Sequence, residues 1–299
     1  MRKNKSLSSI ITKSYFSGAG LFDIGLNMAG IEIAESFELD IDCCKVQTHN
    51  FNHKVTHIDI TKKLVAGDAG ANVMFFTYPC TKYSALSDLH STRTGDEMYL
   101  HAFRHMAIGL PDIFVAENVP GMLAFPVVME AMTKLPGYYV VTFCPIKTET
   151  WLPQRRNRLI IIGSRKPFDW REPKKVTPIK LSAIIERDPI VKWPNAIKHR
   201  MAGMYRDLPI ISDPSAGDIA PTALAHYAKD KSTRLLRDKR FPMGVRPYSV
   251  REYARLQGVP DSFHFNCSAT SAYRMIGNGV SVPVGHWVGT EIKRYFSKN

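Results

Sequence analysis

The stretch TKSYFSGAGLFDIGLNMAG, residues 12–30, predicts how the chain begins to fold. Residues 12–17 are expected to form a strand, and residues 18–30 a loop followed by a helix that Gly30 can end. Glycines in the turn between a strand and a helix let the backbone approach a ligand closely. The stretch therefore predicts the first strand, ligand-binding turn and helix of an α/β fold.

Strand-like and helix-like segments continue to alternate as far as residue 165. The strands are apolar on both faces, which suits a covered, mainly parallel sheet and predicts an α/β domain. Further strands are expected at residues 31–39, 72–78, 112–116, 138–143 and 159–162, and helices at 42–50, 97–109 and 121–135.

Residues 164–245 are rich in proline, lysine and arginine and show little periodicity, which indicates a second, smaller and irregular domain. Regular structure is expected to return at Ser249, where the spacing to Glu252 is that of a capping box. This box opens a predicted helix through Leu256, and a last helix is expected over residues 282–296.

The composition limits the possible partners and cellular settings. Of the 299 residues, 40 are Lys or Arg and 27 are Asp or Glu, and the resulting formal charge of +13 favours nucleic acid over a membrane surface. A charge that serves only solubility is the alternative. No apolar run approaches the roughly 20 residues of a membrane span. The five cysteines form no CxxC pair, so we expect a reduced, cytoplasmic setting and no metal.

Three acidic or glycine-containing segments predict a nucleoside cofactor. Glu38 ends the second predicted strand, 18 residues after Gly20, where a carboxylate can hold both ribose hydroxyls. Asp23 occupies the place of the third glycine of a dinucleotide fingerprint, which favours S-adenosylmethionine over NAD. Asp59 and Ile60 are placed to meet the adenine, although Asp59 is equally consistent with an ordinary turn residue.

Cys80, Glu117 and the arginines Arg156 and Arg158 together suit an attack on a cytosine ring. A thiolate that adds to C6 makes C5 nucleophilic, and a carboxylic acid can protonate or hydrogen-bond N3. The arginines, two residues apart and hence on one side of a strand, can orient the base and the acid. Taken singly, Cys80 suits a small buried hydrophobe, Glu117 an ion-pair partner, and the arginines a solvated face.

At this point the sequence resembles the DNA (cytosine-5) methyltransferase family, in the family's order and over nearly the whole chain. The similar segments are FSGAGLFDIGLNMAG, YPC, ENV, QRRNR, REYARLQGVP and GNGVSVPV. The resemblance implies that Cys80 bonds C6, that Glu117 contacts N3, and that Arg156 and Arg158 are catalytic. It implies a cofactor pocket formed by Phe16, Gly18, Ala19, Gly20, Leu21, Glu38, Leu39, Asp59, Ile60, Pro79, Asn278 and Val280.

The resemblance also implies two domains, a Rossmann-like catalytic domain and a small target-recognition domain. Residues 1–165, completed by 246–299, would bind the cofactor and catalyse, and residues 166–245 would recognise the target, with the cytosine flipped out of duplex DNA. Thr81 stands where the family has glutamine, on a loop that is expected to close over DNA. The expected DNA-binding residues are Lys82, Ser84, Arg93 and Gln154.

The predicted function is therefore a DNA cytosine-5 methyltransferase that uses S-adenosylmethionine. A monomer encoded by a prokaryote or phage is expected, serving restriction–modification or host DNA modification beside a separate endonuclease. A tRNA cytosine-5 methyltransferase and a catalytically silent DNA-binding regulator are the alternatives. A nicotinamide-dependent oxidoreductase is disfavoured by the missing third glycine.

Overall fold

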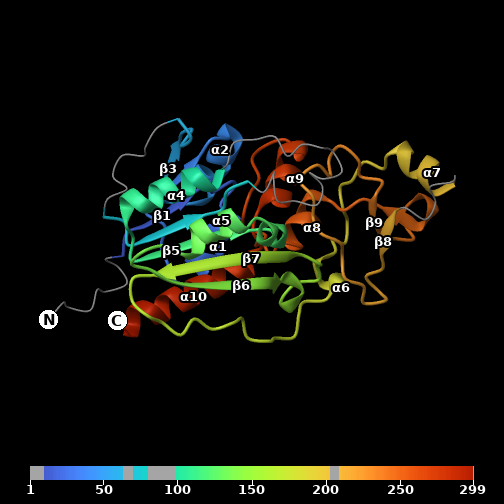
Figure 1. Cartoon of the computed structure of the whole chain (residues 1–299). Helices are drawn as coiled ribbons and strands as arrows, with labels where there is room; N and C mark the ends of the chain where they lie inside the picture. The colour runs from blue at the N-terminus through green and yellow to red at the C-terminus, as the bar shows by residue number, and fades with distance from the viewer. Residues whose placement is uncertain (1–9, 63–69, 80–97, 203–208, 299) are drawn as a thin grey trace. The chain divides into compact units, whose positions relative to one another are not determined.

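The computed structural model of the chain describes residues 10–62, 70–79, 98–202 and 209–298. The chain forms two compact units, which we describe separately (Figure 1). Unit 1 comprises Met1–Ile146, Asn157–Lys174 and Val284–Asn299, and unit 2 comprises Lys147–Arg156 and Lys175–Pro283. The expected division placed residues 246–299 with the catalytic domain, whereas most of that segment, through Pro283, packs within unit 2.

Within its described residues, unit 1 contains a seven-stranded sheet in the order β3-β2-β1-β4-β5-β7-β6. The strands β1 to β5 run parallel, and β7 is antiparallel to β5. The α/β fold class is thus confirmed. The strands are β1 (Thr12–Tyr15), β2 (Glu35–Glu38), β3 (Lys54–His57), β4 (Val73–Phe76), β5 (Ile113–Asn118), β6 (Tyr139–Lys147) and β7 (Asn157–Ser164).

Helices cover both faces of this sheet, as Figure 1 shows. On one face α4 (Met98–Gly109) and α5 (Pro126–Thr133) pack their apolar side chains on strand residues that include Tyr15, Phe76 and Phe114. On the opposite face lie α1 (Leu21–Met28), α2 (Ile41–Asn50) and α10 (Val282–Lys298). Covering both faces explains why β1, β4 and β5 are buried along their whole length.

Unit 2 is more regular than its composition suggested. It contains the helices α6 (Leu181–Ile184), α7 (Asn195–Ala202), α8 (Val250–Arg255) and α9 (Ala269–Asn278). A small sheet is formed by β8 (Ile210–Ser212), β9 (Arg234–Arg237) and β10 (Val245–Arg246). The strands have two to four residues, too few to produce a recognisable alternation of polar and apolar side chains.

Two boundaries show how local chemistry sets the elements. The capping box is confirmed: Ser249 Oγ accepts from the Glu252 amide, and the Glu252 carboxylate accepts from the Ser249 amide. The helix expected over residues 121–135 is divided into a short 3-10 helix (Pro120–Ala124) and α5, because Pro126 lacks the N–H that a continuous helix needs. Within the described residues, no helix is long and apolar enough to cross a membrane.

Candidate active site

The turn after β1 contains two glycines with different tasks. A Cβ on Gly20, whose φ is 80°, would lie 2.5 Å from the Phe51 ring, so the fold itself requires glycine there. A Cβ on Gly18, whose φ is 57°, would meet nothing within 4 Å. The backbone at Gly18 therefore borders open space, as a turn that accepts a ligand requires.

Glu38, at the end of β2, holds this turn from one side. Its carboxylate accepts from the amide nitrogens of Gly18 at 2.7 Å, Leu39 at 2.9 Å and Asp40 at 2.8 Å. Burial raises the pKa of Glu38, while these hydrogen bonds oppose the rise. The carboxylate is thus fixed at the carboxyl end of β2, next to the glycine turn.

Gln47, on α2, holds the same turn from the other side and was not among the predicted residues. Its amide nitrogen donates to Ser17 Oγ at 2.8 Å and to the Gly18 carbonyl at 2.6 Å, and its side chain is fully buried. A glutamine in a polar helix gives no sequence signal for this role, because only the tertiary fold brings it to the turn.

Leu39, Asp59 and Ile60, which were also predicted to bind the cofactor, differ in their contacts and exposure. Leu39 exposes 59% of its surface beside Glu38, so an apolar contact is available to a ring there. Asp59 accepts from Thr61 and pairs with Lys62 at 3.1 Å, and its hydrogen bonds to Thr61 are the main cause that lowers its pKa to about 2. Asp59 thus has the contacts of an ordinary turn residue, which was the alternative to a contact with the adenine. Ile60 is buried, and its carbonyl accepts from Arg104.

The geometry of this turn fits a nucleoside cofactor. The Gly18 backbone faces open space, Glu38 offers a fixed carboxylate, and Leu39 offers an exposed apolar surface. Ala19 and Leu21, which flank Gly20 in the turn, are buried. S-adenosylmethionine meets these requirements because it presents a ribose and an adenine but no pyrophosphate.

Asp23, in the first turn of α1, is a buried carboxyl group that accepts one side-chain hydrogen bond from the described residues. Ser14 Oγ donates to its Oδ1 at 2.9 Å, and Oδ2 has no hydrogen-bond partner among the described residues. Burial raises its pKa to about 7, against the smaller opposing effect of Ser14. Asp23 is therefore largely protonated below neutral pH in the folded protein.

The substitution Asp23→Asn is expected to make stability less dependent on pH. Because the pKa of Asp23 is raised on folding, wild-type stability is greatest below the unfolded-state pKa and is lost as pH rises through about 7. Asparagine keeps the acceptor for Ser14 and cannot ionise. Urea denaturation should show Asp23→Asn gaining roughly 2 kcal/mol on wild type between pH 5 and pH 8. An equal difference at both pH values would contradict this assignment.

Glu117 and Arg158 form an ion pair within unit 1. Glu117 lies near the end of β5 and Arg158 at the start of the adjacent antiparallel β7. Arg158 Nε lies 2.7 Å from Glu117 Oε1, and the two side chains are 11% and 9% exposed. A nearly buried guanidinium fixes the orientation of the carboxyl group, as required of an acid that must meet a base edge.

Asn118 connects this pair to the end of β4. Its Nδ2 donates to the carbonyl of Tyr78 at 3.2 Å, while Thr77 Oγ1 donates to the carbonyl of Phe16 at 2.9 Å. The end of the segment that leads to Pro79 therefore contacts both the glycine turn and the Glu117 strand. Cys80, together with Lys82, Ser84 and Arg93, lies outside the described residues.

Arg156 does not share the surroundings of Arg158. Its side chain is 3% exposed and donates to three main-chain carbonyls of unit 2: Ala223 at 3.0 Å, Gly277 at 2.9 Å and Gly279 at 2.7 Å. Its guanidinium therefore stabilises unit 2 by binding main-chain carbonyls. The sequence had led us to expect a contact with the substrate instead.

Gln154 is likewise occupied inside unit 2. Its side-chain nitrogen donates to the carbonyl of Leu256 at 2.7 Å, and its oxygen accepts from the amide of Ala223 at 2.8 Å. The residue is fully buried. The described contacts thus place Gln154 as a support for α8, with its amide turned into the protein rather than presented to DNA.

Replacing Arg156 by alanine is expected to destabilise the protein by about 3 kcal/mol or more, because three buried carbonyls lose a charged donor. The neighbouring Arg155, whose side chain is exposed, provides a matched control, and Arg155→Ala should change stability by less than about 0.5 kcal/mol. Chemical denaturation of both variants makes the comparison. Equal stability of the two variants would refute the structural role of Arg156.

The C-terminal motifs also make hydrogen bonds inside unit 2. Gln257 donates to the carbonyls of Ile276 at 2.8 Å and Gly279 at 3.1 Å, which fixes the end of α9. Asn278 is exposed at that end, and Val280 is buried. Their expected part in the cofactor pocket stays a prediction.

Comparison with known proteins shows the family of the chain. The family model described as "C-5 cytosine-specific DNA methylase" matches residues 11–203 and 212–294. The chain is 27% identical to the type II methyltransferase M.NlaX of Neisseria lactamica, over 94% of this chain and 96% of that protein. It is 24% identical to M.Sau96I of Staphylococcus aureus, over the whole of this chain and 78% of that protein.

Solved structures show the same fold. The Entamoeba histolytica methyltransferase EhMeth matches with a TM-score of 0.75 at 16% identity, covering 97% of this chain and 98% of that one. The S. pombe Dnmt2 methyltransferase matches with a TM-score of 0.76 at 16% identity, covering 96% and 99%. With the family model matched over most of the sequence, the chain belongs to the C-5 cytosine-specific DNA methylase family.

Proposed function

We propose that the protein transfers a methyl group to C5 of a flipped cytosine in duplex DNA, with Cys80 as the nucleophile and Glu117 as the acid. The observation that carries the proposal is the Glu117–Arg158 pair, which is nearly buried. Asn118, next to Glu117, binds the carbonyl of Tyr78, two residues before Cys80 in the sequence.

Each residue has a defined task in the proposed reaction. The Cys80 thiolate adds to C6 of the ring, and Glu117 donates a hydrogen bond or proton to N3, so that the electrons needed for bond formation gather at C5. Arg158 keeps the carboxyl group of Glu117 in its orientation. After C5 is methylated, loss of the C5 proton expels the thiolate and restores the aromatic ring.

The glycine turn would hold the methyl donor. S-adenosylmethionine, when bound, supplies an electrophilic methyl group. The residues that would hold it are Gly18 through its backbone, Glu38 through its carboxylate and Leu39 through its exposed side chain. Asn278 and Val280 are proposed to complete this pocket.

The distribution of charge favours a polyanionic substrate for unit 2. Its sequence holds 20 Lys and Arg residues against 10 Asp and Glu residues, so this unit carries +10 of the chain's formal +13. A basic excess concentrated in one compact unit is typical of a nucleic-acid surface. We propose that unit 2 binds the DNA target.

Methylation assays with labelled S-adenosylmethionine test this function against the tRNA alternative. Purified protein is incubated with duplex DNA or with tRNA, and the labelled product is digested to nucleosides. Label in 5-methyldeoxycytidine from DNA supports the proposal. Label only in tRNA, or in a nucleoside other than a 5-methylated cytosine, would overturn it.

A role in restriction–modification is proposed because relatives in Neisseria lactamica and Staphylococcus aureus are named type II methyltransferases. A monomer acting in the cytoplasm, with a separate endonuclease, belongs to the same proposal. Bisulfite sequencing of DNA from an expressing host would identify the methylated site.

A further inference from the structure

We infer that the turn joining β9 to β10, residues Asp238–Gly244, is a DNA-reading element in which Met243 contacts a base and Lys239 contacts a phosphate. The inference deepens the proposed function and rests on it. Three features of the turn support this assignment: its backbone conformation, its internal bracing and the surface that it presents.

Met243 adopts a conformation that its side chain disfavours. Its φ is 57° and its ψ is 15°, in the left-handed region where glycine, asparagine and aspartate are the usual residues. Gly244 follows with a φ of 68°. Nevertheless the Met243 side chain is 47% exposed. A strained residue with a long, half-exposed apolar side chain contributes little to the fold, and such residues concentrate at binding sites.

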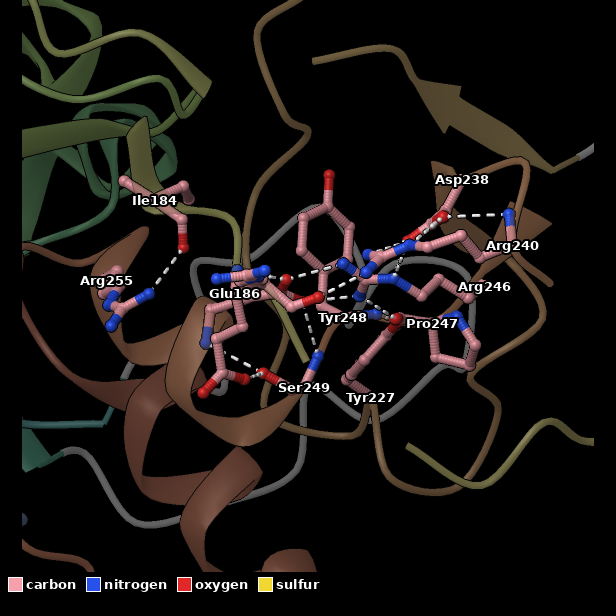
Figure 2. A network of polar contacts seen from close by, with 12 residues as sticks. Ile184, Glu186, Tyr227, Asp238, Arg240, Arg246, Pro247, Tyr248, Ser249 and Arg255 are labelled. Carbon is pink, nitrogen blue, oxygen red and sulfur yellow. Dashed lines mark hydrogen bonds and ion pairs between the residues drawn. The ribbon is translucent and has the colours of Figure 1, made fainter. Parts of the chain in front are cut away.

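A buried network, shown in Figure 2, holds the turn in this conformation. Arg246 is fully buried and donates to Asp238 at 2.7 Å and to both carboxylate oxygens of Glu252 at 2.7 Å. Asp238 also accepts from Arg240, on the outer side of the turn. Glu252 in turn accepts from the amides of Glu186 and Ser249. Both ends of the turn are therefore anchored to α8 and to the segment that follows α6.

The surface of the turn suits a nucleic acid. Arg237, Arg240 and Arg246 each pair with a carboxylate, and these pairs use Asp213, Asp238 and Glu252. Lys239 is exposed, and the described residues provide it with no carboxylate partner.

Lysine at such a place can bind a phosphate, and methionine can contact a thymine methyl group or enter a base step. Duplex DNA is the partner that matches both side chains, on a unit that carries a formal charge of +10.

The test measures the roles of Met243 and Lys239 separately. Methylation of a duplex library with randomised bases around the preferred site is sequenced after bisulfite treatment. Met243→Gly and Met243→Asn should reduce the preference for at least one base position about 5- to 100-fold, with similar activity on the best remaining sequences. Glycine tolerates this backbone conformation, so the melting temperature should be kept or raised.

Lys239→Ala should weaken DNA binding by a similar factor for every sequence and lower the slope of log Kd against log salt by about 1. Lys134→Ala, which removes one exposed lysine at the end of α5 in unit 1, is the control and should change neither quantity. Unchanged base preference in both Met243 variants together with an unchanged salt slope in Lys239→Ala would overturn the inference. A wild-type protein that methylates no duplex DNA would instead overturn the proposed function.

Discussion

Cys80→Ser is expected to lower the rate of cytosine methylation at least about 10³-fold, while the Kd for S-adenosylmethionine stays within roughly 2-fold of wild type. A serine hydroxyl is hardly ionised at neutral pH and adds to an electron-poor ring far more slowly than a thiolate. The proposed cofactor site, at Gly18, Glu38 and Leu39, involves other residues. Single-turnover methylation and equilibrium binding of the cofactor measure the two quantities.

Cys144 provides the matched control for this experiment. It is a free, partly buried thiol of unit 1, and Cys144→Ser should retain nearly full activity. Loss of activity in both variants would indicate a general effect of removing a thiol. Activity of Cys80→Ser near the wild-type level would show that no covalent addition by this residue occurs.

Glu117→Gln is expected to reduce kcat about 10²- to 10⁴-fold, the range usual for removal of a general acid. Glutamine has nearly the same shape and can still accept from Arg158, so the local fold should persist. The amide cannot transfer a proton to N3 and leaves the charge that develops on the ring less stabilised. Rates at saturating DNA and cofactor isolate the chemical step from binding.

Glu130→Gln, an exposed position on α5, removes the same charge elsewhere on unit 1 and should leave kcat unchanged. A Glu117→Gln enzyme with a kcat within about 3-fold of wild type would exclude Glu117 as the acid. A raised KM for DNA with an unchanged kcat would instead assign Glu117 to substrate binding.

The parts of the site that the sequence predicted share one physical origin. Glu38 ends β2 next to the turn after β1, and parallel neighbouring strands bring such ends together. Glu117 and Arg158 were likewise placed by the strands that carry them. Because each residue sits at a strand end, its approximate position follows from the topology.

The residues whose contacts the sequence did not indicate depend on packing instead. The rule that residues two apart share a face suggested a common role for Arg156 and Arg158, but β7 begins at Asn157. Arg156 therefore precedes the strand and belongs to unit 2, where its side chain donates to main-chain carbonyls. Gln47 lies far along α2 from any motif, so no pattern could indicate that it holds the Gly18 carbonyl.

Strand β3 and the extent of unit 2 also left no pattern in the sequence, for physical reasons. β3 is an edge strand of four partly exposed residues, KVTH, with no apolar alternation to reveal it. The boundary at residue 246 was placed by the return of helical periodicity. The contacts of Arg246 with Asp238 and of Gln257 with Gln154 join that segment to the rest of unit 2, and such contacts leave no periodic trace.

The central claim is that one thiol forms a bond with the pyrimidine ring during methyl transfer. Incubation with S-adenosylmethionine and duplex DNA containing 5-fluorocytosine tests it directly, because fluorine at C5 blocks the elimination that releases the enzyme. We predict a complex that survives denaturation and whose cross-linked peptide, identified by mass spectrometry, carries the DNA on Cys80. Absence of such a complex from protein that methylates unmodified DNA, or attachment at another residue, would contradict the account.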